Sequence, residues 1–162
     1  MEDFGNVALQ RLLAEHPGDV TATHADHGDA TACVDRDCLI DVFEFLRDDP
    51  ACGFEMLTDL TVVDYLGEEP RFEVVYHLYS VTHHHRLRVK ARVAESELEV
   101  ASLTALYASA NWMEREAFDL YGIRFAGHPD LRRILLYDEF EGHPLRKDYP
   151  KQRRQPLVGP RN

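Results

Sequence analysis

Three acidic residues that lie close together in the sequence are the first candidates for chemistry. Glu114, Glu116 and Asp119 fall within one six-residue stretch, and paired carboxylates are the usual groups for general acid–base catalysis. The same stretch supplies no nucleophile, and Arg115 lies between the acids. We therefore favour an ion-pair network over a catalytic carboxylate cluster for these side chains.

Histidines form the second group of candidate chemical residues. The run at 83–85 invites a metal ion, but adjacent residues on a strand point to opposite faces and make a poor tetrahedral site, so we predict a polar bend. His128 and His143 each precede a proline, which favours an extended backbone, and we interpret both as hydrogen-bonding turn residues. A free-standing metal-dependent enzyme that uses these histidines is the alternative from a different class.

The sequence shows no cysteine motif for a metal or cluster, no phosphate-binding loop and no nucleophile motif. The three cysteines, Cys33, Cys38 and Cys52, show neither a C-x-x-C pair nor an iron–sulfur spacing, so we predict ordinary reduced thiols. The sequence has no glycine-rich phosphate loop and no G-x-S-x-G nucleophile motif. No metal, cofactor or catalytic site is therefore expected in this chain.

The acids must be positioned by a helix, which the sequence predicts over 111–121. Asn111 is the expected N-cap, with Glu114 completing a capping box. Gly122 is the expected left-handed residue after the helix, and Ile123 is expected to close the cap by a hydrophobic contact.

The helical period places the charged residues of this helix on different sides. At about 100° per residue, Glu114 falls on the apolar side, whereas Arg115 and Asp119 fall on the opposite side at the favourable i,i+4 spacing. An unpaired buried carboxylate is costly, so Glu114 needs a partner. The cations predicted as that partner are Arg132, Arg133 and Arg146.

A short internal repeat follows the helix. Gly127-His128-Pro129 leads to Leu131-Arg132-Arg133, and Gly142-His143-Pro144 leads to Leu145-Arg146-Lys147. The apolar run 134–137 between the two copies is too short for a free-standing helix. We interpret the whole segment as one that lies on a surface, either its own or that of another chain.

The rest of the chain predicts an α+β fold. The pattern favours a two-layer sandwich, in which helices cover one face of a largely antiparallel or mixed sheet, followed by an irregular basic C-terminal tail. A single domain is expected over 1–150 and an extended or disordered tail over 151–162. The expected helices are 7–15 and 38–47, the latter capped by Asp37; the expected strands are 19–24, 31–35, 57–66, 72–81 and 87–93, and a short helical turn capped by Ser102 is expected through Tyr107.

Charge is distributed unevenly along the chain. The net charge of −11 combines 8 basic and 21 acidic residues over 1–111 (−13) with 10 and 8 over 112–162 (+2). This acidic body disfavours nucleic acid as a partner, and it makes the basic end from Arg146 onward a contact arm or, alternatively, a solvated tail. No apolar run is long enough to span a membrane and no secretory signal is visible, so a cytoplasmic location is expected.

The predicted helix and the segment that follows it resemble a known family. Glu114-Arg115-Glu116, Asp119-Leu120-Tyr121, His128, Arg132 and Ile134-Leu135 match the signature of the 30 kDa-type (C-type) subunit of proton-translocating NADH:quinone oxidoreductase, respiratory complex I. The closing stretch 142–150 is also similar to that family. The specific resemblance covers about the last third of the chain. The signature or interface residues that it implies are Glu114, Arg115, Glu116, Asp119, His128, Arg132, Arg133, His143, Arg146, Lys147, Asp148 and Tyr149.

The resemblance implies a structural subunit without a catalytic site of its own. Such a subunit belongs to the peripheral arm, on the cytoplasmic face of the bacterial inner membrane, and packs against the quinone-site (D-type) subunit. The complex as a whole uses NADH, FMN, iron–sulfur clusters and quinone, which other chains bind, and couples electron transfer to proton translocation. The equivalent subunit of a membrane-bound [NiFe]-hydrogenase or an F420H2-type dehydrogenase is the alternative.

Overall fold

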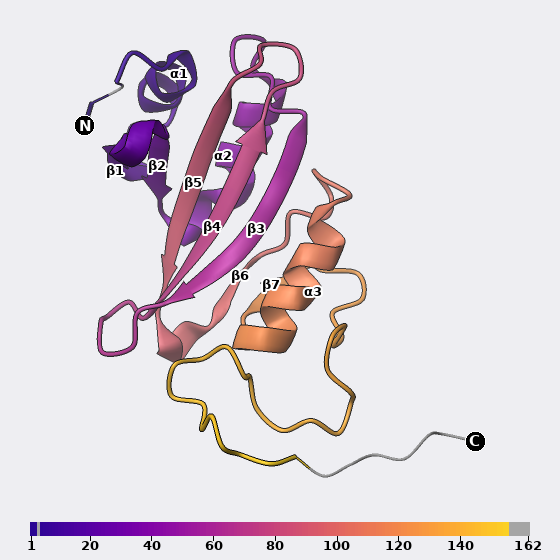
Figure 1. Ribbon diagram of the computed structural model, residues 1–162. Coiled ribbons are helices and arrows are strands. Elements are labelled where there is room, and N and C mark those ends of the chain that lie inside the picture. The colour runs from indigo at the N-terminus through magenta and orange to yellow at the C-terminus, as the bar shows by residue number, and fades with distance from the viewer. Residues whose placement is uncertain (3, 156–162) are drawn as a thin grey trace.

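Five strands form one mixed sheet in the computed structural model, which describes residues 1–2 and 4–155 (Figure 1). The sheet order is β1-β2-β5-β4-β3, and every neighbouring pair is antiparallel except β2 and β5. This arrangement confirms the predicted α+β class with a mixed sheet. The strands are β1 (Val20–His24), β2 (Thr31–Val34), β3 (Met56–Asp64), β4 (Phe72–Tyr79) and β5 (Arg86–Val93).

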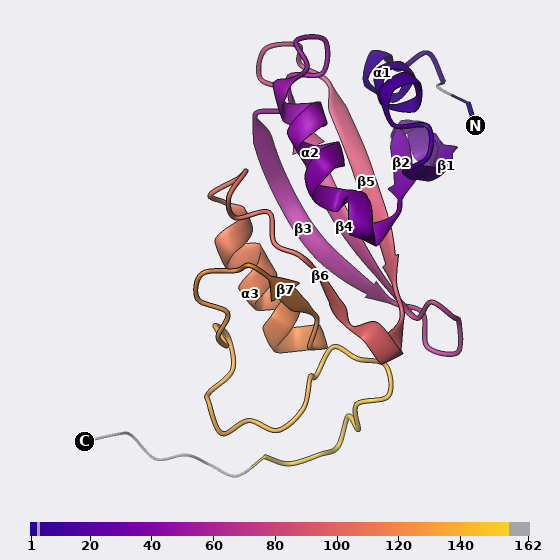
Figure 2. The same ribbon diagram turned by 180° about the vertical axis from the view of Figure 1, so that it is seen from behind.

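Alternation along the strands separates a buried face of the sheet from a polar one. On β5, the apolar members of the alternating run are buried, whereas the basic members are only partly covered. Helices α1 (Val7–Glu15) and α2 (Leu39–Asp48) lie on the apolar side, where α2 crosses the sheet (Figures 1 and 2). On the other face, basic side chains of β5 form ion pairs with acidic side chains, as Lys90 does with Glu73 at 3.2 Å.

A second, two-stranded sheet is formed by the strands that come before and after the signature helix in the sequence. Strands β6 (Glu99–Ala101) and β7 (Arg124–Ala126) run parallel and flank α3 (Ala110–Tyr121) in the sequence. Their central residues, Val100 and Phe125, are buried in the main core. The sequence did not predict these strands, because three residues are too few to show a period.

Two predicted helix starts are wrong and one predicted helix end is confirmed. Helix α3 begins at Ala110, so Asn111 lies inside it, and no side chain of the described residues caps its N-terminus. Helix α2 begins at Leu39, and the acidic cap belongs to Asp35, whose carboxylate accepts from the N–H of Asp37 ahead of the helix. Gly122 ends α3 with φ +79°, as expected for a left-handed cap.

The chain after β7 has no regular secondary structure as far as residue 155. We call residues 127–150 the C-terminal segment. The segment first runs along α3 on the side away from the five-stranded sheet and then passes beneath the end of that sheet, where Lys147 and Asp148 bond to Asp64 and Arg71 (Figures 1 and 2). The expected tail of 151–162 is described only to residue 155. No helix in the described part of the chain is both long and apolar enough to cross a membrane.

Candidate functional site

Glu114 is fully buried and is held by the loop that precedes its helix. Its carboxylate accepts a hydrogen bond from Ser102 Oγ at 2.6 Å and one from the N–H of Leu103 at 2.7 Å. Burial raises the pKa of Glu114 to about 7, against these two hydrogen bonds, which lower it. Its burial was predicted correctly, but its predicted partner was wrong. The loop at 102–103 supplies neutral donors, and none of the three proposed arginines bonds to Glu114.

Asp119 is also fully buried, and it anchors the C-terminal segment. One carboxylate oxygen accepts three successive backbone N–H groups, from Ile134, Leu135 and Leu136, at 2.8–3.0 Å. The other oxygen accepts from Arg133 at 2.7 Å. Burial alone would raise the pKa of Asp119, but these four donors outweigh it and leave the pKa below its ordinary value.

The predicted exposure of Asp119 and its predicted pairing with Arg115 are wrong. The sequence placed Asp119 on the exposed side of the helix, paired with Arg115. In the structure the C-terminal segment covers that side and supplies the donors that make a buried carboxylate tolerable. Arg115 instead donates to the main-chain carbonyl oxygens of Arg132 and Arg133, at 3.2 and 3.3 Å.

A second cluster, here called the Arg71 cluster, fixes the other end of the segment; Arg71 and Asp64 are buried, whereas Glu95 and Asp148 are about half exposed. The guanidinium of Arg71 bonds Asp64 at 2.8 and 2.9 Å, Glu95 at 2.9 Å and Asp148 at 2.9 and 3.1 Å. Asp64 also accepts from the backbone N–H of Lys147. The hydrogen bond from Arg71 is the main reason that the pKa of Asp64 lies below its ordinary value. No local sequence pattern indicates this cluster, because its members come from distant stretches of the chain.

Both signature histidines hold the backbone, as predicted for turn residues. His128 Nε2 donates to the carbonyl oxygen of Asn111 at 3.2 Å, while its Nδ1 accepts from the N–H of Asp130 at 3.0 Å. His143 Nδ1 donates to the carbonyl oxygen of Asp119 at 2.9 Å. Each ring thereby connects the C-terminal segment to one end of α3.

The remaining signature residues lie at the edges of these contacts. Arg146 donates to the carbonyl oxygen of Tyr121 at 2.7 Å, and the ring of Tyr149 stacks on Phe140. Arg132 is exposed and pairs with Asp130 at 3.0 Å, and Glu116 is exposed. The three acids of the signature thus face three surroundings, namely the loop before the helix, the segment after it, and solvent. They do not form one acid–base cluster.

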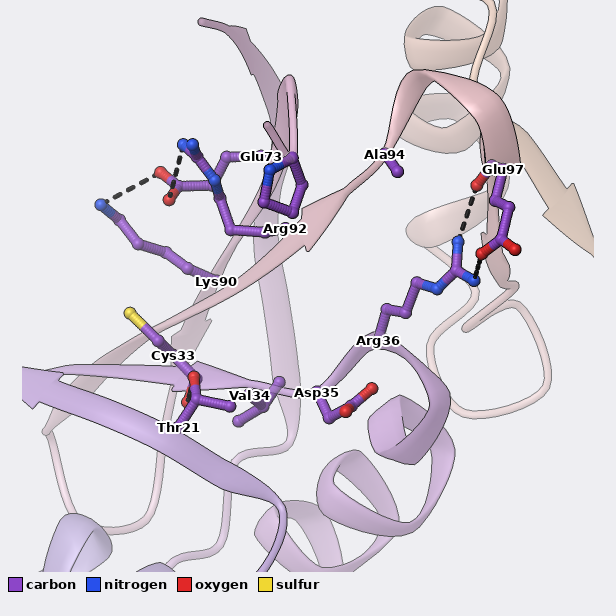
Figure 3. Close-up of a pocket in the computed structure, with 11 residues that line it drawn as sticks. Thr21, Cys33, Val34, Asp35, Arg36, Glu73, Lys90, Arg92, Ala94 and Glu97 are labelled. Carbon is purple, nitrogen blue, oxygen red and sulfur yellow. Dashed lines mark hydrogen bonds and ion pairs between the residues drawn. The ribbon is translucent and has the colours of Figure 1, made fainter. Parts of the chain in front are cut away.

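A hollow of about 300 Å³ opens elsewhere, where the polar face of the sheet meets the start of α2 (Figure 3). Its charged side chains pair with one another, since Lys90 and Arg92 point to Glu73 and Arg36 reaches Glu97. Burial raises the pKa of its thiol, Cys33, so that group stays protonated at neutral pH. No signature residue lines this hollow.

Groups that could hold a metal ion are scattered across residues 1–2 and 4–155. No three His, Cys, Asp or Glu side chains come together there as ligands for an ion. Each of Cys33, Cys38 and Cys52 is a free thiol.

The fold and site together define a two-layer α+β domain whose signature residues fasten its own C-terminal segment. The family described as "Respiratory-chain NADH dehydrogenase, 30 Kd subunit" matches residues 32–155, and the chain belongs to this family. The C-type subunit of NADH-quinone oxidoreductase from Citrifermentans bemidjiense is 51% identical over 160 residues, covering 98% of this chain and 91% of the relative. That of Trichlorobacter lovleyi is 48% identical over 157 residues, covering 95% and 96%.

One solved structure agrees with this membership, and a second shares the fold. A chain described as "Nqo5 of the trypsin-resistant fragment (1-134)" is 32% identical with a TM-score of 0.67, covering 76% of this chain and 99% of that one. A chain of the membrane-bound sulfane sulfur reductase, an archaeal respiratory membrane complex, has a TM-score of 0.75 at 22% identity, covering 92% and 87%. The second likeness shows the fold alone.

Proposed function

We propose that the chain acts as a structural subunit of an NADH-quinone oxidoreductase and supplies contacts rather than a reaction site. The observation that carries this proposal is the match, along nearly the whole chain, to relatives named as the C-type subunit of that complex. In this role the NADH, FMN, iron–sulfur clusters and quinone are bound by other subunits. The complex transfers electrons from NADH to quinone.

The internal pairing of the signature residues supports a structural role. A catalytic acid or base has to reach a substrate, but Glu114 and Asp119 are fully buried and their oxygens are occupied by hydrogen bonds from the chain itself. The contacts of Glu114 fix the loop before α3, and those of Asp119, with His128, His143 and Arg146, hold the irregular segment 127–150 against α3. Long irregular segments that are held in place are commonly used for binding.

The partner that we propose for this chain is the quinone-site (D-type) subunit. The chain would bind it in the peripheral arm, at the cytoplasmic face of the membrane, and would be attached to the membrane only through the complex. The basic end from Arg146 onward is proposed to extend along that partner. The structure narrows this part of the proposal, since Arg146, Lys147 and Asp148 already bond to the body of the chain. After Pro150, Arg153 and Gln155 bond, among the residues that the structure describes, to Glu141 and Tyr149 of the C-terminal segment and not to the body of the chain, and we propose that the part from Lys151 onward reaches the partner.

Truncation tests this proposal. A chain that ends at Pro150 keeps both anchors of the C-terminal segment, so its unfolding should match that of the full chain. In its host, the truncated chain should give less assembled complex on a native gel and less NADH:quinone activity in membranes. Normal assembly and normal activity of the truncated chain would contradict the proposed role of the basic end.

The second candidate function is the equivalent subunit of a sister complex. The fold likeness to a chain of the archaeal respiratory membrane complex supports this candidate. Sequence identity favours the first candidate, at 48–51% against 22%. The proteins that accompany the chain in its own membranes distinguish the two candidates.

A further inference from the structure

The outer side of α3 carries an exposed apolar group that the core does not use. Trp112, the only tryptophan in the chain, is 63% exposed, and Leu135 on the overlying segment is 62% exposed. Leu145 is also exposed, and its N–H donates to the carbonyl oxygen of Leu120 near the end of the helix. Exposed apolar side chains therefore lie near the first turn of α3, on the segment that covers it, and near its last turn.

Arg115 joins this group into one fixed surface. It lies three residues after Trp112, on the same side of the helix, and its guanidinium sits 5.3 Å from the centre of the indole ring. The same guanidinium donates to the carbonyl oxygens of Arg132 and Arg133. Leu135 lies two residues after Arg133, and its backbone N–H donates to the carboxylate of Asp119. We call Trp112, Arg115, Arg132 and Leu135 the Trp112 surface.

The composition and rigidity of the Trp112 surface are those of a protein interface. Tryptophan and arginine dominate the residues that contribute most to binding between proteins, and lysine, glutamate and aspartate are depleted there. Side chains that are already held in place lose less conformational entropy on binding. At 63% exposure, Trp112 contributes little to the core, and its ring is available to a partner.

Charge indicates which kind of partner surface fits. Residues 1–111 carry 8 basic and 21 acidic side chains, a balance of −13, whereas residues 112–162 carry 10 and 8, a balance of +2. An acidic partner is therefore repelled by the body of the chain and accepted at this end. Arg132 is 71% exposed, with Asp130 as its ion-pair partner, and it lies where such a partner would meet the chain.

We propose that the Trp112 surface docks into another subunit of the same complex, one that presents an apolar hollow for Trp112 and Leu135 bordered by carboxylates facing Arg115 and Arg132. This inference rests on the proposed function, because it takes the partner from the same assembly. It adds the surface that is used and the chemistry of the surface that receives it. The proposed contact between the partner and the basic end after Pro150 does not depend on this inference.

The test uses the tagged full-length chain, expressed in its host and purified gently with its complex. The variant Trp112→Ala should leave the complex about tenfold faster or more in a salt wash, as is usual for a central interface tryptophan. Leu66→Ala is the matched control, because Leu66 is a comparably exposed apolar residue at 51% in the turn between β3 and β4. Leu66→Ala should dissociate like the parent chain.

Charge reversal gives a second matched pair. Arg132 and Arg124 are equally exposed, at 71% and 72%, and each pairs with one exposed acid. Arg132→Glu should weaken retention in the complex several-fold, whereas Arg124→Glu on β7 should not. Thermal midpoints of the four isolated variants should agree with that of the parent, since none of these side chains belongs to the core.

Different results separate this inference from the proposed function. If the parent chain is recovered without companions, the proposed function fails. If the parent brings its companions and Trp112→Ala and Arg132→Glu are retained like their controls, the inference alone fails. It also fails if the purified parent chain binds phosphatidylglycerol vesicles, or associates with itself, and Trp112→Ala abolishes that binding while leaving retention in the complex unchanged.

Discussion

Replacing Glu114 with glutamine tests the account of the buried signature acid most sharply. The glutamine oxygen still accepts from the N–H of Leu103, while its NH2 group donates to Ser102 Oγ, which reverses the hydrogen bond that Ser102 donates in the parent chain. The substitution therefore keeps the shape and both partners and removes the ionisation; the reversed hydrogen bond changes the stability by an amount that does not depend on pH. Any pH dependence of stability that the parent shows and the variant lacks belongs to Glu114.

The sign and size of this effect follow from the raised pKa. Burial raises the pKa of Glu114 from 4.5 to about 7 in the folded chain, so the folded state binds the proton more tightly than the unfolded state. The resulting stabilisation is fully present below the unfolded pKa and is lost as the pH rises through the folded pKa. A shift of this size corresponds to about 3 kcal/mol, at about 1.4 kcal/mol per pKa unit.

The assay is urea unfolding of the full chain followed by circular dichroism at several pH values between about 4.5 and 8. The free energy of unfolding of Glu114→Gln, relative to the parent, should rise by about 3 kcal/mol across this range. Glu116→Gln is the control, and its difference from the parent should stay within about 0.5 kcal/mol because Glu116 is exposed. A constant difference between Glu114→Gln and the parent at all pH values would refute the reasoning.

Two further substitutions test how the C-terminal segment is held. Asp119→Ala removes the acceptor of three backbone N–H groups and the carboxylate partner of Arg133, whose guanidinium keeps the main-chain carbonyl oxygens of residue 119 and Gly142. It should cost about 3–5 kcal/mol by urea unfolding and speed trypsin cleavage after Arg133, whereas an unchanged cleavage rate would contradict the anchor. Gly122→Ala puts a Cβ 2.6 Å from the ring of His143 at φ +79°, whereas Gly127→Ala at φ +86° meets nothing within 4 Å. Both variants should lose about 1 kcal/mol to backbone strain, and only Gly122→Ala should lose more; equal losses in unfolding free energy would show that His143 is not packed there.

Local patterns in the sequence were enough to predict most of the sheet and helices. The alternation of apolar and basic residues along β5 predicted its two faces, and the first helix has the predicted bounds of 7–15. The start of α3 was less predictable. Asn111 is a strong capping residue by type, but the turn through Tyr107 leads into the helix and moves the N-cap position to Ser109, two residues earlier.

Contacts between distant parts of the chain were beyond local reasoning. The helical period placed Glu114 on the buried side correctly, yet its partners precede the helix by several residues and precede Glu114 itself by more than ten. The same period assigned Asp119 to solvent, because a single helix does not reveal that a later segment covers its outer side. The Arg71 cluster joins residues as far apart as Asp64 and Asp148, and neither residue shows a local pattern.

The central claim is that this chain works as one subunit of an NADH-quinone oxidoreductase, and its companions test that claim most directly. The tagged chain would be purified gently from its own membranes, and the proteins recovered with it identified by mass spectrometry. The account predicts flavin, iron–sulfur and membrane-arm subunits together with NADH:quinone activity. Recovery of the chain alone, or with hydrogenase or F420-linked subunits, would contradict it.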